Sequence, residues 1–214
     1  TREAGAIDRA VLQRMNDSQH HRGPDEGSLH VEPGLGFGHR RLSIIDIATG
    51  QQPLFNADGS VAIVFNGEIY NYQPLMAELQ ALGYAFHTKS DTEVIVHAWE
   101  AWGPKCVDRL RGMFAFAIWD RKQQTLFLAR DRLGVKPMYY AVLDDGTLLF
   151  GSELKSVLAH GGLRRNIDPL AAEEYFALGY VAEPRTIFKQ ALKLPPAHTL
   201  LVRRGRPVPS PAEY

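Results

Sequence analysis

The sequence contains very little cysteine, no excess of charge of either sign and no long apolar run. Its 214 residues include one cysteine, Cys106, so neither an intramolecular disulfide nor a zinc site made of several cysteines can form. Basic and acidic residues number 24 each, and a net charge of zero gives no field that would concentrate nucleic acid or anionic lipid. The longest apolar run, residues 113–119, is far shorter than the about 20 residues of a membrane span.

The N-terminal residues also lack a targeting signal. Residues 1–5 are polar and contain no apolar segment of the kind that forms a signal peptide. The apolar fraction of 45% and the charged fraction of 22% are those of an ordinary globular domain. We therefore expect a cytoplasmic protein with no nucleic-acid partner and no membrane partner.

The periodicity of apolar residues predicts helices and strands that are interleaved along the chain. Spacings of three and four residues predict helices at residues 7–15, 75–82, 91–102, 153–160 and 169–178. Short apolar and β-branched runs predict strands at residues 28–32, 35–45, 61–65, 114–120, 125–131, 138–143, 147–151 and 198–203. Because the connections are short, we expect antiparallel pairing and an α+β architecture with helices packed outside the sheets.

The end of the chain differs in composition from the rest. Five of the 13 prolines fall between Pro195 and Pro211, which is typical of a segment that leaves a domain. We therefore divide the chain into a domain at residues 1–194 and a Pro-rich exit segment at residues 195–214.

Asn66 and Gly67 follow the apolar strand predicted at residues 61–65. An Asn side-chain amide beside a Gly backbone N–H supplies two donors, as an oxyanion hole requires, and glycine lets a ligand approach the backbone closely. The alternative is an ordinary Asn-Gly hairpin turn. The dipeptide alone leaves both interpretations open.

Two charged residues have a structural and a functional interpretation each. Arg41 lies in an otherwise apolar strand and needs a carboxylate partner, which is either a ligand or an internal acid such as Asp46. Asp91 follows Ser90 at the start of a predicted helix whose Ser90 and Glu93 form a capping box. Asp91 either stabilises the positive end of that helix or holds the ammonium group of a ligand.

Three other candidates for a metal site or a nucleophile are better explained by structural roles. His20 and His21 are adjacent and have no third ligand at metal spacing, so we predict no metal site. No motif presents Cys106, which we expect to be buried packing. Thr1 could act as an N-terminal nucleophile, but residues 1–5 contain no strand to hold it.

Seven short motifs occur in a fixed order along nearly the whole chain. They are His21-Arg22-Gly23-Pro24-Asp25, Arg41-Leu42-Ser43-Ile44-Ile45-Asp46, Asn66-Gly67-Glu68-Ile69-Tyr70-Asn71, Ser90-Asp91-Thr92-Glu93-Val94, Gly112-Met113-Phe114-Ala115-Phe116, Arg130-Asp131-Arg132-Leu133-Gly134 and Ser152-Glu153-Leu154-Lys155. Together these motifs resemble the class II glutaminase domain of asparagine synthetase-type amidotransferases. Their sequences are also similar to the branch of that family associated with exosortase and exopolysaccharide loci.

The resemblance implies an N-terminal-nucleophile hydrolase fold, a four-layer αββα sandwich, that binds L-glutamine and releases ammonia from it. By position, Arg41 would hold the α-carboxylate of glutamine, and Asp91 and Glu68 would surround its α-amino group. Asn66 and Gly67 would stabilise the tetrahedral oxyanion. The resemblance implies no cofactor in this domain, because ATP and Mg are expected only in a C-terminal synthetase domain. It also allows a homodimer as the assembly.

The chain departs from the family pattern in two respects. The family's nucleophile is a cysteine that begins a short apolar strand, whereas this chain opens with Thr1-Arg2-Glu3. We therefore expect the chain to lack the attacking thiol and to be inactive alone. The ATP-dependent synthetase domain, a partner in cis, is also expected to lie outside the chain. The alternative function is a non-catalytic domain that binds glutamine or acts as a scaffold.

Overall fold

The computed structural model describes residues 6–42 and 51–214. Its helices are α1 (Arg9–Asp17), α2 (Tyr72–Ala81), α3 (Asp91–Trp102), α4 (Leu154–Leu158) and α5 (Pro169–Leu178), with short 3-10 helices η1 (His20–Arg22) and η2 (Gly103–Asp108). Its strands are β1 (Glu26–Glu32), β2 (Leu35–Arg41), β3 (Leu54–Phe55), β4 (Val61–Ile69), β5 (Gly112–Asp120), β6 (Thr125–Arg130), β7 (Tyr139–Val142), β8 (Leu148–Gly151), β9 (Ala191–Lys193), β10 (His198–Arg203) and β11 (Ala212–Glu213).

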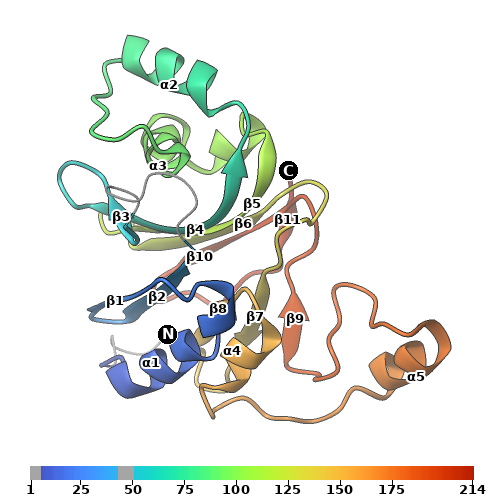
Figure 1. Cartoon of the computed structure of the whole chain (residues 1–214). Helices are drawn as coiled ribbons and strands as arrows, with labels where there is room; N and C mark the ends of the chain where they lie inside the picture. Colours follow the sequence, from blue (N-terminus) through green and yellow to red (C-terminus); the bar gives the residue numbers. More distant parts are fainter. Residues whose placement is uncertain (1–5, 43–50) are drawn as a thin grey trace.

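The elements stack in four layers, helices outside and strands inside (Figure 1). A six-stranded sheet in the order β11-β10-β6-β5-β4-β3 forms one inner layer, and α2 and α3 cover its outer face. The other inner layer contains a two-stranded sheet, β1-β2, and a three-stranded sheet, β8-β7-β9, with α1 and α4 outside them. Every strand pair in these sheets is antiparallel. The predicted α+β sandwich is therefore confirmed.

Three apolar clusters fill the three spaces between the four layers. One cluster joins α2 and α3 to the six-stranded sheet, with Trp99 and Phe116 at its centre. A second lies between the two inner layers and includes Phe37 and Leu128, both fully buried. A third packs α4 against β7 and β8 around Val157. Alternating side chains on β4 and β5 supply the first two clusters at once, which is what a sheet buried on both faces requires.

Local signals fix the ends of the helices. The Asp8 carboxylate accepts hydrogen bonds from the amides of Ala10 and Val11 and so caps α1. Ser90 caps α3 by accepting from the Thr92 amide. The predicted capping box is wrong in its second half, because Glu93 accepts from the amides of His87 and Thr88 in the preceding loop, at 2.8 and 2.7 Å.

The largest difference from the sequence prediction is in β4. The strand was expected to end at residue 65, but it continues through Asn66, Gly67 and Glu68 to Ile69, each opposite a residue of β5. Polar residues and a glycine weaken the strand signal, yet the partner strand β5 holds this segment extended. An Asn-Gly hairpin turn is thereby excluded.

The Pro-rich segment contributes strands to the six-stranded sheet. Within residues 195–214, β10 pairs with both β6 and β11, and Leu200 is fully buried. The connection from this segment to a synthetase domain stays a prediction. Across the described parts of the chain, the helices are all too short or too polar to span a lipid bilayer.

Candidate functional site

One edge of β4 carries a row of backbone groups that point away from β5. Along this edge the Phe65 amide donates to Gln52 Oε1 at 2.6 Å, and the Phe65 carbonyl lies 3.2 Å from His39 Nε2. Four residues further, the Ile69 amide donates to Asp91 Oδ2 at 3.0 Å. Side chains therefore satisfy the edge on both sides of Gly67.

The Gly67 amide points to the same side as those of Phe65 and Ile69. Gly67 lies opposite Phe114, whose carbonyl accepts from the Asp131 amide and whose amide donates to Asp131 Oδ2. Because both polar groups of Phe114 face β6, the Gly67 and Phe114 backbones do not bond to each other. Within residues 6–42 and 51–214, no group accepts a hydrogen bond from the Gly67 amide, so this donor is available to a ligand.

Only glycine fits at position 67. A Cβ placed there would lie 2.2 Å from the Met113 carbonyl oxygen and 2.7 Å from the Phe114 Cα, both of them backbone atoms. The close approach of β4 and β5 thus requires a residue without a side chain. Asn66 precedes it and lines a cavity, and its side-chain amide is free of partners among the described residues.

Asp91 lies beside Glu68 at the start of α3. Burial is the main cause that raises the pKa of Asp91 above its ordinary value, and the nearby Glu68 carboxylate raises it further. Glu68 itself is exposed. The two carboxylates form a pair of negative groups in which Asp91 accepts hydrogen bonds from the backbone amides of Ile69 and Thr92, and this pair suits a ligand ammonium group.

Arg41 is buried at the end of β2, two residues beyond His39. Its Nη1 lies 3.5 Å from Glu26 Oε2, so an internal acid does contact the guanidinium, as one of the two interpretations requires. The other predicted partner, Asp46, lies outside the described residues. Burial lowers the pKa of His39, and the Arg41 charge lowers it further. A neutral His39 can therefore hydrogen-bond to β4 without adding charge to the site.

A cavity of about 710 Å³ lies between the two inner layers. Its walls come from α1, β2, β8 and the inner face of the six-stranded sheet, and Asn66 and His39 line it. Of the five predicted site residues, Asn66 alone lines this cavity. Gly67 and Glu68 lie further along β4, Asp91 lies at the start of α3, and Arg41 lies at the end of β2. The five residues therefore come from three elements, and β4 carries three of them.

The cavity also separates two unpaired strand edges. In the described chain, β2 pairs only with β1, and β8 pairs only with β7. Residues of both strands, among them Gly36, Gly38 and Gly151, line the cavity. The two sheets of this layer are therefore separated by an apolar space with hydrogen-bonding groups on both sides.

Other polar candidates have structural roles. Cys106 is fully buried, and desolvation raises the pKa of its thiol to about 12, so it is not a nucleophile at neutral pH. In the described residues there is no group of His, Cys, Asp and Glu that could hold a metal ion, and His21 instead lies 3.0 Å from Glu153. Thr1 lies outside the described residues.

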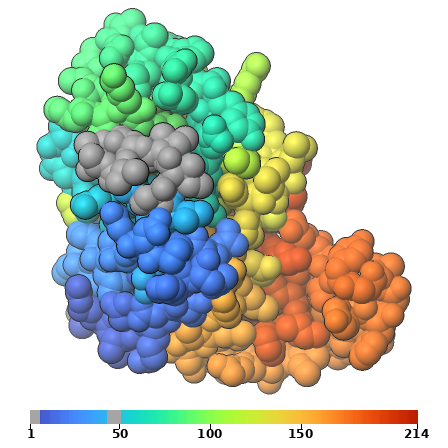
Figure 2. All heavy atoms as spheres, in the orientation of Figure 1, coloured from blue at the N-terminus to red at the C-terminus, as the bar shows by residue number. Residues whose placement is uncertain are grey.

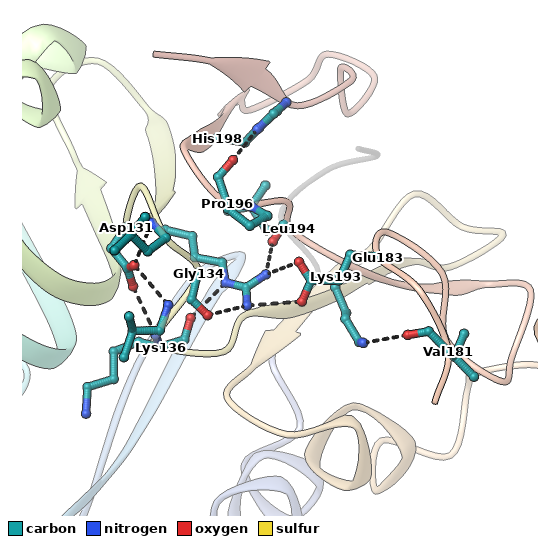
Figure 3. Close-up of polar contacts among 12 residues, drawn as sticks. Asp131, Gly134, Lys136, Val181, Glu183, Lys193, Leu194, Pro196 and His198 are labelled. Carbon is teal, nitrogen blue, oxygen red and sulfur yellow. Dashed lines mark hydrogen bonds and ion pairs between the residues drawn. The ribbon is translucent and has the colours of Figure 1, made fainter. Parts of the chain in front are cut away.

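The loop after β6 is built around two buried charged residues, Arg130 and Asp131. The Arg130 guanidinium contacts Glu183 at 2.9 Å, the Leu194 carbonyl at 2.7 Å and the Gly134 carbonyl at 2.8 Å. Asp131 accepts from the amides of Val135 and Lys136 at 2.9 Å (Figure 3). This loop fixes the end of β6 beside Phe114 and so supports the strand that faces Gly67.

Sequence reasoning missed two residues at this site. His39 and Gln52 both bond to the Phe65 backbone, and Gln52 also accepts from the Ser28 hydroxyl through its carbonyl. Neither belongs to a helix or strand pattern that marks a site. The one available signal was a histidine directly before two arginines in an apolar strand.

Comparison with known proteins identifies the family to which this chain belongs. Residues 3–211 match the glutamine amidotransferase domain. The chain is 43% identical over 197 residues to asparagine synthetase [glutamine-hydrolyzing] 3 of Bacillus subtilis, covering 90% of this chain and 32% of the relative. It is 37% identical over 211 residues to a putative asparagine synthetase [glutamine-hydrolyzing] 2 of Methanocaldococcus jannaschii, covering 89% and 40%. The chain thus spans about a third of the length of these relatives.

Solved structures show the same fold. Glutamine phosphoribosylpyrophosphate amidotransferase from B. subtilis superimposes with a TM-score of 0.59 at 22% identity, covering 86% of this chain and 35% of that one. A structure described as the allosteric regulatory enzyme of purine biosynthesis gives 0.58 at 21% identity, with 81% and 34% covered. The fold is that of the N-terminal-nucleophile hydrolases, and the chain belongs to the glutamine amidotransferase domain family.

Proposed function

We propose that this domain hydrolyses L-glutamine and supplies ammonia to an ATP-dependent synthetase portion of the same polypeptide. The observation that carries the proposal is the free Gly67 amide, held between two satisfied neighbours beside the Asn66 side chain. Two donors at fixed positions suit the oxyanion that forms when a nucleophile attacks an amide carbonyl. The match with asparagine synthetases that are named glutamine-hydrolyzing supports the same chemistry.

The remaining residues would bind the α-substituents of glutamine. The Arg41 guanidinium would hold the α-carboxylate, in place of or beside its contact with Glu26. Asp91, with Glu68 close by, would hold the α-ammonium group. Opposite charges at two ends of the site would orient the side-chain amide toward Asn66 and Gly67.

The nucleophile in this proposal is a cysteine on an additional β-strand. Cys106, the one cysteine of the sequence, is buried in the core and excluded. A strand between β2 and β8 would pair with both free edges, fill the cavity and bring its first residue near Asn66. The thiolate would attack the amide carbon, ammonia would leave, and water would release glutamate from the thioester.

In this proposal the acceptor of the ammonia is a carboxylate activated by ATP, and the similarity to proteins named asparagine synthetase [glutamine-hydrolyzing] supports it. ATP and Mg would bind to the synthetase portion and not to this domain. Asparagine synthesis, amidation of a sugar acid and modification of a peptide are the alternatives for the acceptor reaction, and the synthetase portion would distinguish them.

The experiment joins an apolar strand that begins with cysteine to this chain and measures glutamate release. Arg41→Ala should raise the KM for glutamine strongly, because the α-carboxylate loses its charged partner. Arg206→Ala, at an exposed position away from the site, serves as the matched control. If the joined protein binds glutamine but releases no glutamate, a non-catalytic binding domain is the better description. If Arg41→Ala changes neither binding nor hydrolysis, the proposed glutamine site is wrong.

A further inference from the structure

Helix α5 is mostly apolar, with Glu173 and Glu174 as its charged residues, but it is almost unburied. Among its ten residues, Ala171 alone is buried. Phe176 is 87% exposed and Leu170 is 58% exposed. Large apolar side chains of a helix normally lie against other parts of a protein, so their exposure here points to a partner that covers them.

The exposed apolar residues are grouped on a projecting part of the molecule. Figure 2 shows residues of this region, in orange, as a lobe that stands out from the body, and Figure 1 shows α5 at its tip. We call this surface the α5 face, and it consists of Ile167, Leu170, Tyr175, Phe176, Leu178 and Tyr180, each more than half exposed. Several large apolar side chains exposed on one lobe are typical of an interaction site.

Polar contacts hold the α5 face in a fixed position. Asp168 caps the helix start, and Gly179 ends it in the left-handed conformation. Glu174, on the inner side, pairs with Arg185 and accepts from the Ala182 amide at 3.2 Å. The caps fix where α5 begins and ends, and the contacts of Glu174 tie the helix to the loop that follows it.

The base of the lobe connects to the candidate site. Glu183 pairs with Arg130, and the Lys193 ammonium donates to the Val181 carbonyl at 3.1 Å (Figure 3). Arg130 lies opposite Ala115 on β5, and Ala115 lies opposite Asn66 on β4. The α5 face is therefore joined to the oxyanion-hole strand through two adjacent strand pairs.

We propose that the α5 face docks the ATP-dependent synthetase portion of the same polypeptide, an inference that rests on the proposed function. The chain covers 32% and 40% of the two relatives described above, so in those proteins most of the polypeptide lies outside this domain. Interfaces between domains of one chain bury about 600–1,500 Å². A rigid apolar face connected to the glutaminase strands suits that partner, because ammonia must pass between the two portions without loss.

The first experiment uses the full polypeptide and locates the partner by photo-crosslinking. A benzophenone side chain replaces Phe176 in one variant and Leu82, which is 58% exposed at the end of α2, in the control. We expect position 176 to crosslink within the chain to the synthetase portion and position 82 not to do so. Crosslinking of position 176 to a second copy, or to nothing, would overturn the proposal.

The second experiment compares Phe176→Asp with Leu82→Asp by activity. Phe176→Asp should raise the ratio of glutamate released to ATP consumed several-fold, while synthesis driven by added ammonia is kept. Leu82→Asp should behave as the wild type. Equal ratios in the two variants would contradict docking. Absence of glutamate release from the wild type would refute the proposed function instead, and the crosslinking result would still decide the docking.

Discussion

At the scale of single residues, the candidate site depends on a carboxylate in an unfavourable environment. Asp91 is partly buried and lies beside Glu68, so its ionised form is disfavoured and its pKa is raised. Its hydrogen bonds from the backbone amides of Ile69 and Thr92 act in the opposite direction but do not cancel the effect. A ligand ammonium group would supply the missing positive charge. The same residue therefore explains why α3 begins beside β4.

This environment predicts a pH dependence of glutamine binding. Above its raised pKa Asp91 is ionised and attracts the ammonium group, and as the pH falls through that pKa the attraction is lost. Glutamine affinity should therefore decrease on acidification, starting above the ordinary pKa of 3.8. Asp91→Asn, which keeps an oxygen acceptor for the Ile69 amide, should bind weakly at every pH in this range. Isothermal titration calorimetry at a series of pH values measures both.

The control for this prediction is Asp108→Asn, because Asp108 is exposed at the end of η2. It should keep the pH dependence of the wild type. The assignment of Asp91 to the ammonium group would be refuted by an Asp91→Asn variant whose affinity and pH dependence match those of the wild type.

At the scale of elements, β4 is the structure on which the site depends. It carries Asn66 and Gly67, and one edge pairs with β5 along its whole length. The opposite edge pairs with β3 at its start and then contacts His39, Gln52 and Asp91. The strand presents donors at a fixed spacing because no side chain separates it from β5 at Gly67. Rigid strands hold such groups more accurately than loops do.

Gly67→Ala should abolish glutamate release by the strand-containing protein. The new Cβ would meet backbone atoms of Met113 and Phe114, so β4 and β5 must separate, at a cost of about 1–3 kcal/mol of unfolding free energy. Gly83→Ala is the matched control: it has open space, but its φ of +96° makes alanine unfavourable by about 1–2 kcal/mol. Thermal unfolding and glutamate release are measured for both.

The comparison separates loss of the site from loss of stability. Both variants should unfold at a lower temperature, whereas only Gly67→Ala should lose hydrolysis. Hydrolysis by Gly67→Ala at the level of Gly83→Ala would mean that the Gly67 amide does not take part.

The contrast between α5 and β4 shows how much of this fold the sequence predicts. The bounds of α5 and β10 agree with their predictions, because a capping Asp168, a terminating Gly179 and an apolar run are local signals. The extension of β4 past residue 65 was missed, since pairing with β5 is a contact between distant parts of the chain. The same reason explains the site: residue types indicated Asn66, Gly67 and Asp91, but only the fold reveals that His39 and Gln52 satisfy the neighbouring amide and carbonyl.

At the scale of the whole molecule, one of the two inner layers is divided. The six-stranded sheet is continuous, whereas the layer facing it consists of two sheets with a cavity of about 710 Å³ between β2 and β8. Interiors of proteins are close-packed, so a space of this size beside two unpaired strand edges is a place for further polypeptide. The proposed nucleophile strand would make the two sheets continuous.

A peptide with the sequence pattern of such a strand should therefore stabilise this chain when added in trans. Binding to the folded state alone raises the unfolding free energy by about 2.7 kcal/mol at a peptide concentration 100 times its Kd, so the Tm should rise with peptide concentration. Amides of β2 and β8 should exchange more slowly with solvent at the same time. A peptide in which alanine replaces the leading cysteine should stabilise equally but support no glutamate release, which separates strand pairing from catalysis. A peptide with prolines at alternate positions cannot donate to the strand edges and should leave the Tm unchanged. If the proline peptide stabilises as much as the others, the cavity binds apolar side chains without strand pairing, and the nucleophile must be sought elsewhere.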